Sequence, residues 1–344
     1  MKSKGRILGV WDLRAAPLSF GGPLFLLEEM LTQAAIHNAE SEGLCFLGDT
    51  KGSSVSSFMS DVIGAGPISP AAVKNSTLLT TLLSLRGIEK CYGAASASSL
   101  RNLMSRNGGD WLAWPPLPSD EKPVIHEYGM STFIKGFHRQ FGSIPFLHSK
   151  PETLRRAFRF LKARVLPTAP VVVHLKNNPR ETGCSNAAQH EWAAFFDSCL
   201  DRHDVKFLLI GNEGIAESIS KLSNVVVARN YDLQLPEELA LIELSFLFMG
   251  MASGPCTFAL FGETPYLIYK NPEHHAKEME KELEGHDHFS FAKPFQKVLR
   301  VNESTEQLLS QFLSVYSEPN RTAWKRRLAV AAEQIDEPTN VFFN

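Results

Sequence analysis

The chain has no excess of either charge. Its 344 residues include 35 lysines and arginines and 37 aspartates and glutamates, which leaves a formal net charge of −2. No basic cluster interleaved with aromatics is present, so the charge pattern gives no reason to expect a nucleic acid partner. Apolar residues make up 44% and charged residues 21% of the chain, a composition typical of a folded globular protein.

Long apolar runs and paired cysteines are also lacking. No uninterrupted apolar stretch reaches the roughly 18 residues of a membrane-spanning helix, although peripheral contact with a membrane stays open. The run from Ile7 to Trp11 is too short for a signal-peptide core. The five cysteines are odd in number, scattered and without C-x-x-C spacing, so we expect a reducing cytoplasm.

Several catalytic fingerprints are missing. The chain contains no G-x-S-x-G elbow, Walker loop, H-E-x-x-H helix or G-x-G-x-x-G motif, which argues against serine hydrolases, P-loop kinases, zincins and ordinary dinucleotide dehydrogenases. The segment from Glu284 to His288, with His274 and His275 upstream, has the residue types of a metal site. Its spacing matches no usual zinc pattern, so we expect a polar loop and no metal, and leave open whether His286, Asp287 and His288 have a function.

The first half of the chain alternates strand-like and helix-like segments. Apolar runs predict strands at 6–11, 43–47, 88–92, 111–114 and 124–127, and helical periodicity predicts helices at 24–37, 71–85 and 98–105. This alternation is typical of βαβ units.

The second half repeats this rhythm after a proline-marked junction that carries a basic helix at 151–165. Strands are expected at 171–176, 205–210, 225–228, 247–251 and from Pro265, and helices at 186–200, 215–222, 237–244, 305–316 and 319–335. Near-continuous apolar strands indicate a parallel sheet covered on both faces. We therefore predict an α/β fold with two Rossmann-like doubly wound domains facing a central cleft: residues 1–150, a hinge at 151–170, residues 171–317, and a C-terminal helix and tail at 318–344.

The segment from Phe246 to Tyr269 is the most informative part of the sequence. It predicts a buried strand, a turn of small residues, a short helix and another buried strand. Ser253 and Gly254 fall at the expected helix start, where backbone N–H groups bind phosphate oxygens, and the Thr257 hydroxyl is near. A diphosphate is therefore the predicted ligand. The alternative is a close strand–helix contact that merely needs small residues.

Two further strand ends in this domain carry ligand-binding residue types. His174, Lys176 and Arg180 follow one strand, where cations can clamp a phosphate or neutralise a leaving diphosphate. Gly211 and Glu213 follow the next, where glycine permits close approach and a carboxylate can accept sugar or ribose hydroxyls. The alternatives are a solvated loop with His174 as a hydrogen-bonded core residue, and a plain turn that needs glycine.

The first domain offers two candidates for a general base. Asp12 follows its first strand and could accept a proton from an acceptor hydroxyl, and Glu127, at the end of the expected 124–127 strand, is the second choice. The alternative for Asp12 is a structural role in its loop, or a surface pair with Arg14 that contributes little.

With these residues in view, the chain resembles glycosyltransferases of the GT-B architecture. The stretch from Met249 to Pro265 resembles the diphosphate-holding segment of heptosyltransferase-like enzymes. The 171–180 segment is similar to the strand ending in His-x-Arg of fucosyltransferases, with Lys176 in place of arginine. Gly21 and Gly22 resemble the glycine-rich turn after the first strand.

This resemblance implies sugar transfer from a nucleotide-activated donor to a hydroxyl acceptor, with a role in building a surface glycan or polysaccharide. It implies that the N-terminal domain faces the acceptor, that the C-terminal domain holds the nucleotide sugar, and that no cofactor or metal is obligatory beyond the donor. Two other readings stay open: a nucleotide-sugar epimerase of the same architecture, and a non-catalytic module that binds a glycan or nucleotide.

Overall fold

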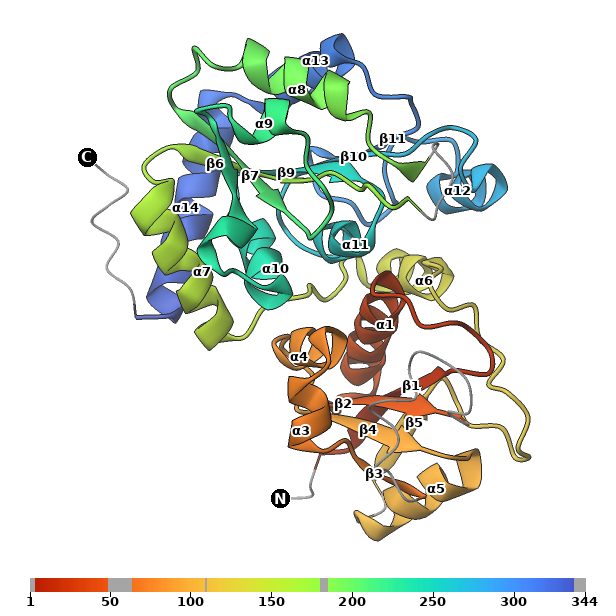
Figure 1. Cartoon of the computed structure of the whole chain (residues 1–344). Coiled ribbons are helices and arrows are strands. Elements are labelled where there is room, and N and C mark those ends of the chain that lie inside the picture. Colours follow the sequence, from red (N-terminus) through yellow and green to blue (C-terminus); the bar gives the residue numbers. More distant parts are fainter. Residues whose placement is uncertain (1–3, 49–63, 109, 180–184, 337–344) are drawn as a thin grey trace. The chain divides into compact units, whose positions relative to one another are not determined.

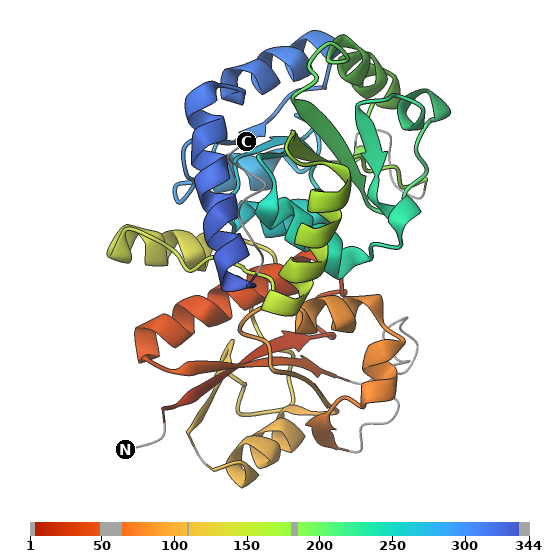
Figure 2. The same cartoon turned by 90° about the vertical axis from the view of Figure 1, so that its left-hand side faces the viewer.

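The computed structural model describes residues 4–48, 64–108, 110–179 and 185–336. The chain divides into two compact units, Met1–Leu147 and His148–Asn344. Each unit contains one β-sheet accompanied by helices (Figures 1 and 2). The predicted α/β class with two Rossmann-like domains is confirmed.

The sheet of the first unit has the strand order β3-β4-β2-β1-β5. β3 is antiparallel to β4, and the other neighbouring strands are parallel. The strands are β1 (Arg6–Asp12), β2 (Glu40–Leu47), β3 (Ala65–Pro67), β4 (Lys90–Ala94) and β5 (Trp111–Trp114). The helices of this unit are α1 (Gly21–His37), α3 (Pro70–Lys74), α4 (Thr77–Leu83), α5 (Ala97–Arg106) and α6 (Thr132–Phe141).

Two expectations for this unit are wrong. The single helix expected at 71–85 is divided into α3 and α4, because Ser76 adopts an extended conformation and its hydroxyl accepts a hydrogen bond from Leu79 N, which starts a new helix. No strand forms at 124–127, where Val124 N donates to a side chain instead of a neighbouring strand and Ile125 is fully exposed.

The sheet of the second unit is parallel throughout, in the order β11-β10-β9-β6-β7-β8. The strands are β6 (Ala169–His174), β7 (Val205–Ile210), β8 (Val225–Val227), β9 (Leu247–Met251), β10 (Tyr266–Tyr269) and β11 (Gln296–Leu299). The helices are α7 (Pro151–Arg164), α8 (Gln189–Ser198), α9 (Glu217–Ser220), α10 (Leu235–Leu244), α11 (Gly254–Leu260), α12 (Ala276–Leu283), α13 (Thr305–Val315) and α14 (Glu318–Gln334), with the 3₁₀ helix η2 (Ala228–Tyr231).

Helices cover both faces of this sheet, as the apolar strands predict (Figure 1). On one face the buried Phe195 and Phe196 of α8 and Phe312 of α13 contact Phe207 of β7. On the other, α7, α10 and α14 pack together. Burial on both faces leaves the strand ends and the loops after them as the exposed, chemically varied part of the unit. Among the described residues, no helix has the length and apolarity to cross a membrane.

Candidate functional site

Four residues of the second unit lie in neighbouring positions along the carboxyl edge of its sheet. His174 of β6 is the register partner of Gly250 of β9. Lys176 and Ala252 each follow one of these partners by two residues, so their backbones are at the same level along the strand direction. Tyr269 pairs with Met251 on one side and with Leu299 on the other. Ala252 N donates to Tyr269 O at 3.2 Å and Lys270 N to Leu299 O at 3.0 Å, so the ladder extends one step beyond the strands. Lys176, Ala252, Lys270 and Arg300 therefore lie on successive strand ends of β6, β9, β10 and β11.

His174 connects two of the predicted ligand-binding residues. Its Nδ1 lies 2.9 Å from Ser253 Oγ, and its Nε2 lies 3.3 Å from Glu213 Oε1. The imidazole is 3% exposed, while the Glu213 side chain is 24% exposed. A buried ring held at both nitrogens fixes the directions of its two partners, so His174 has the position of a residue that orients a site.

Ser253 stands at the N-cap of α11 without capping it. Its backbone is extended, as at an ordinary N-cap, but its side chain makes no cap hydrogen bond because the hydroxyl lies against His174. An N-cap serine normally satisfies one of the first N–H groups of its helix, with a contribution of about 1 kcal/mol. Ser253 and Gly254 are partly exposed, whereas Thr257 is buried and its hydroxyl donates to Ser253 O at 3.5 Å.

Glycine at position 211 is required by the backbone and by its neighbours. Gly211 has φ +98°, and a Cβ there would lie 2.4 Å from Glu213 Oε2 and 2.9 Å from the His174 ring. Burial opposes ionisation of Glu213, but the hydrogen bond and charge of His174 prevail and lower the pKa of the carboxyl. Glu213 Oε2 is buried and has no hydrogen-bond partner among the described residues, which leaves one acceptor for a ligand hydroxyl.

Lys270 and Arg300 were not anticipated from the sequence. Burial lowers the pKa of Lys270, and the positive charges of Arg300 and Lys176 lower it further, against opposing effects of Cys256 and Glu278. Burial also lowers the pKa of Arg300, whose Nη2 donates to the Pro272 carbonyl. A signal was present for Lys270, which directly follows the apolar residues of β10, but it was weak for Arg300, because β11 is half polar and was not predicted.

In the first unit, Asp12 is buried and its carboxylate is fully occupied. Oδ1 accepts from Arg14 N at 2.9 Å and Arg14 Nε at 3.0 Å, and Oδ2 accepts from Arg14 Nη2 and Val124 N, both at 2.8 Å. Burial raises the pKa of Asp12, but these bonds outweigh it and the net shift is downward. The geometry is that of a residue that anchors two loops, and a catalytic role for it stays a prediction.

The second predicted base, Glu127, lies exposed in the loop after Val124. The neighbouring His126 points instead to helix α1, where its Nε2 lies 2.7 Å from Glu29 Oε2. The same oxygen accepts from Trp114 Nε1 at 2.9 Å. Next to it, Glu28 is fully buried, neither of its oxygens has a hydrogen-bond partner in the described chain, and burial raises the pKa of its carboxyl.

Of the predicted residues, the structure thus brings together His174, Gly211, Glu213 and Ser253, with Gly254 next along the chain and Lys176 on the same sheet edge. Arg180 lies outside the described residues. Asp12 and Glu127 belong to the first unit.

The histidine-rich segment is a polar loop in the described part of the chain. Asp287 Oδ1 lies 2.8 Å from His288 Nδ1, and Asp287 Oδ2 pairs with Lys297 at 3.0 Å. Where residues are described, no group of three or more His, Cys, Asp or Glu side chains converges in a way that would hold a metal ion.

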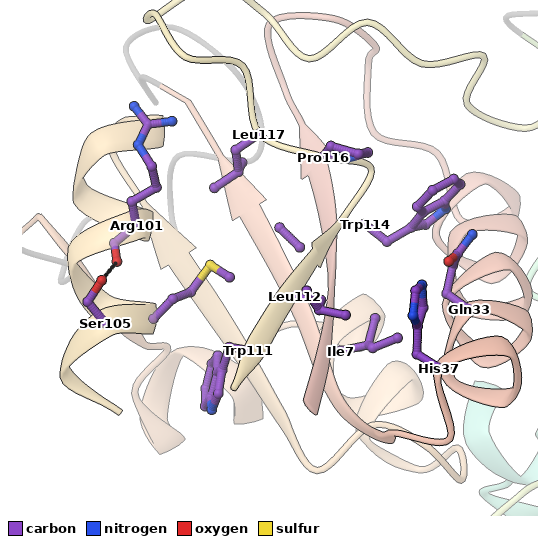
Figure 3. Close-up of a pocket in the computed structure, with 12 residues that line it drawn as sticks. Ile7, Gln33, His37, Arg101, Ser105, Trp111, Leu112, Trp114, Pro116 and Leu117 are labelled. Atoms are coloured by element: carbon purple, nitrogen blue, oxygen red, sulfur yellow. Dashed lines mark hydrogen bonds between the residues drawn. The ribbon is translucent and has the colours of Figure 1, made fainter. Parts of the chain in front are cut away.

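A groove with a volume of about 540 Å³ follows β5, the edge strand of the first sheet (Figure 3). His37 and Gln33 of α1 border it on one side and Arg101 of α5 on the other, with Leu112 between them. None of the predicted site residues lines this groove.

Comparison with known proteins finds likeness in structure alone. No protein-family model matches the chain, and no curated protein matches it in sequence. A solved structure of the glycosyl transferase family 9 from Veillonella parvula matches it with a TM-score of 0.51 at 11% identity, over 97% of each chain. A weaker match is the E. coli ADP-heptose LPS heptosyltransferase II, with a TM-score of 0.47 and 10% identity, covering 96% of this chain and 99% of that one. Another is E. coli heptosyltransferase WaaC with ADP, with a TM-score of 0.45 and 12% identity, covering 92% of this chain and 99% of that one. The likeness to the Veillonella parvula structure shows that this chain shares its fold, the GT-B architecture expected from the sequence.

Proposed function

We propose that the protein transfers a sugar from a nucleotide-activated donor to a hydroxyl acceptor. One observation carries this proposal: in a chain with the fold of a glycosyl transferase, the carboxyl edge of the second sheet gathers Glu213, His174, Ser253 and a line of cations. Ligands of open α/β sheets bind at this edge, and these groups suit the hydroxyls and phosphates of a nucleotide sugar.

In this proposal the donor lies along the sheet edge. The unpaired Glu213 Oε2 accepts a ribose hydroxyl, and His174 holds that carboxylate and the Ser253 hydroxyl in place. The diphosphate binds to the uncapped start of α11 at Ser253 and Gly254, next to Lys176. As the bond to the sugar breaks, negative charge grows on the leaving diphosphate, and nearby cations and N–H groups stabilise it.

The general base comes from the first unit. We assign this role to Glu127, which is exposed, rather than to Asp12, because both oxygens of the buried Asp12 carboxylate already accept two hydrogen bonds each. Replacing Glu127 with Gln should therefore lower turnover with little effect on donor affinity. An unchanged turnover in Glu127→Gln would return the role to Asp12.

A thermal-shift screen with uridine, guanosine, cytidine and adenosine diphosphates and their sugars tests the proposal. Ligand at about 100 times its Kd stabilises the native state by about 2.7 kcal/mol, so one nucleotide should raise the melting temperature clearly. Ser253→Ala should weaken this shift, and Ser314→Ala, an exposed serine on α13, should not. The absence of a shift with every nucleotide would refute the proposal.

A second measurement separates transfer from epimerisation, the other enzyme reading of the sequence. The donor that binds is incubated with the protein alone and the sugar is analysed. A transferase leaves the sugar configuration unchanged, apart from slow hydrolysis, whereas an epimerase inverts a carbon without any acceptor.

A further inference from the structure

Three cations occupy neighbouring positions on the carboxyl edge of the second sheet. Lys270 and Arg300 follow the adjacent strands β10 and β11 at the same level, and Lys176 comes two residues after His174, the last residue of β6. Strands are about 4.8 Å apart, so the backbones of Lys270 and Arg300 are neighbours, and Lys176 is two strands from Lys270. Like charges at such separations repel, which raises the free energy of the empty site.

The protein offsets this repulsion only in part. Burial and the charges of Arg300 and Lys176 lower the pKa of Lys270 in spite of the opposing effects of Cys256 and of Glu278 on α12. Arg300 Nε is buried and has no hydrogen-bond partner among the described residues. A buried donor without a partner is energetically unfavourable, so an anion that accepts a hydrogen bond from Arg300 Nε would stabilise the site. Both features favour the binding of a further anion.

The position of Lys270 and Arg300 relative to the proposed donor indicates which anion they would bind. If Glu213 after β7 holds the ribose and the start of α11 after β9 holds the diphosphate, the donor runs along the sheet edge from β7 towards β11. Lys270 and Arg300 then lie beyond the diphosphate. The two strand spacings from β9 to β11 amount to about 10 Å, enough for a hexose linked to the second phosphate.

We propose that the donor sugar carries its own carboxylate and that Lys270 and Arg300 bind it. This inference rests on the proposed function and names its substrate class, a nucleotide-activated acidic sugar. A diphosphate diester carries two negative charges, which in the proposed arrangement would be met by Lys176 and the N–H groups at α11. A carboxylate on the sugar would bring a further negative charge to the two remaining cations, and the planar arginine fork suits a carboxylate better than a sugar hydroxyl.

Calorimetric titration of the full chain with matched donors tests this inference. The pairs are UDP-glucose against UDP-glucuronate and GDP-mannose against GDP-mannuronate, because the members of each pair differ only in the carboxylate. Free UDP and GDP are titrated in parallel. The variants are Lys270→Gln and Arg300→Gln, with Lys221→Gln as control, since Lys221 is exposed at the end of α9, before β8 begins, and pairs with Glu217.

In the wild type we expect at least one acidic donor to bind about tenfold more tightly than its neutral partner. Each site variant should reduce this preference to about twofold or less and leave the affinity for the free diphosphate within about twofold, while Lys221→Gln retains the preference. Far-UV circular dichroism verifies folding, and either site variant suffices if the other fails to fold.

Equal affinities within both pairs would overturn the inference. An equal loss of affinity for free diphosphate and acidic donor in Lys270→Gln and Arg300→Gln would also overturn it, because the cations would then act on the diphosphate. Failure of the proposed function has a different signature: in that case none of the four nucleoside diphosphates of the thermal-shift screen binds, nor does any of their sugars.

Discussion

The carboxyl edges of the two sheets use charge in opposite ways. In the first unit, Asp12 follows β1 and its carboxylate accepts four hydrogen bonds, three from Arg14 and one from Val124. In the second unit, Lys270 and Arg300 follow β10 and β11, act on each other as like charges, and leave Arg300 Nε without a partner among the described residues. One edge therefore uses its charges to hold loops, whereas the other, in our proposal, presents its charges to a ligand.

The largest expected effect on stability concerns Asp12, at the carboxyl edge of the first sheet, where the charged groups already have hydrogen-bond partners. Asp12→Ala should lower the free energy of unfolding by about 3 kcal/mol, because it removes a buried carboxylate and leaves Val124 N and the Arg14 guanidinium without their acceptor. Chemical denaturation monitored by fluorescence measures this loss. Asp120→Ala is the control, since Asp120 pairs with Lys122 on the surface and should leave stability unchanged.

The pH dependence of Asp12 gives a second measure of the same contacts. Its pKa is lowered in the folded state, so its contribution is complete above the ordinary aspartate pKa of 3.8 and is lost as the pH falls through the folded-state pKa. Asp12→Ala should remove this part of the acid dependence. An Asp12→Ala protein as stable as the wild type but without turnover would instead indicate a catalytic carboxylate and break the comparison.

The next effect concerns the loop after β7, at the edge of the second sheet where we propose that the ligand binds. Gly211→Ala should cost about 1–3 kcal/mol, because φ is +98° and the new Cβ would meet Glu213 Oε2 and the His174 ring. The displaced carboxylate should also weaken nucleotide binding in the thermal-shift assay. Gly214→Ala in the same loop is the matched control, since a Cβ there would meet no heavy atom closer than 3.8 Å. If Gly211→Ala and Gly214→Ala had the same stability and the same nucleotide binding, the positions of the Glu213 and His174 side chains would not matter for either property.

Much of this edge could be predicted because parallel strands place their ends together. Apolar runs predict β6, β7 and β9, and from those strands it follows that His174, Glu213 and Ser253 converge. The hydrogen bonds among them do not follow, because the sequence does not show that the Ser253 hydroxyl lies against His174 and leaves α11 without a side-chain cap.

The failures have identifiable physical causes. β11 has only four residues and two of them, Gln296 and Lys297, are polar, so its apolar signal is weak and Arg300 was not recognised as a strand-end residue. Val124 and Ile125 suggest a strand by residue type, yet Val124 N is bound to Asp12 and Ile125 is fully exposed. In both cases, whether a strand forms is decided by pairing with segments that are distant in the sequence.

A smaller effect should come from adjacent carboxylates on α1 in the first unit. Glu28 is buried without a partner among the described residues, and its folded-state pKa is raised, so ionisation destabilises the fold increasingly as the pH rises above the ordinary value of 4.5. Glu28→Gln should therefore raise the unfolding free energy at neutral pH by about 1 kcal/mol. Glu29→Gln should lower it by about as much, since Glu29 accepts from Trp114 and lies against His126. Denaturation at pH 5 and pH 8 separates the two, and a loss of stability in Glu28→Gln would mean that its carboxylate has a partner.

The smallest expected effect tests whether the ligand-binding edge is under electrostatic repulsion when it is empty. Lys270→Gln removes one of the clustered cations, so the ligand-free protein should gain about 0.5 kcal/mol at low ionic strength, and the gain should shrink as salt screens the cluster. Raising the pH of the wild type towards 10.5 should act in the same direction, because a lowered folded-state pKa means that the unfolded chain binds more protons there. Lys221→Gln provides the baseline, since its exposed pair with Glu217 should contribute nothing measurable. If Lys270→Gln destabilised the ligand-free protein, the chain itself would supply a partner for Lys270, and the two sheet edges would no longer differ in kind.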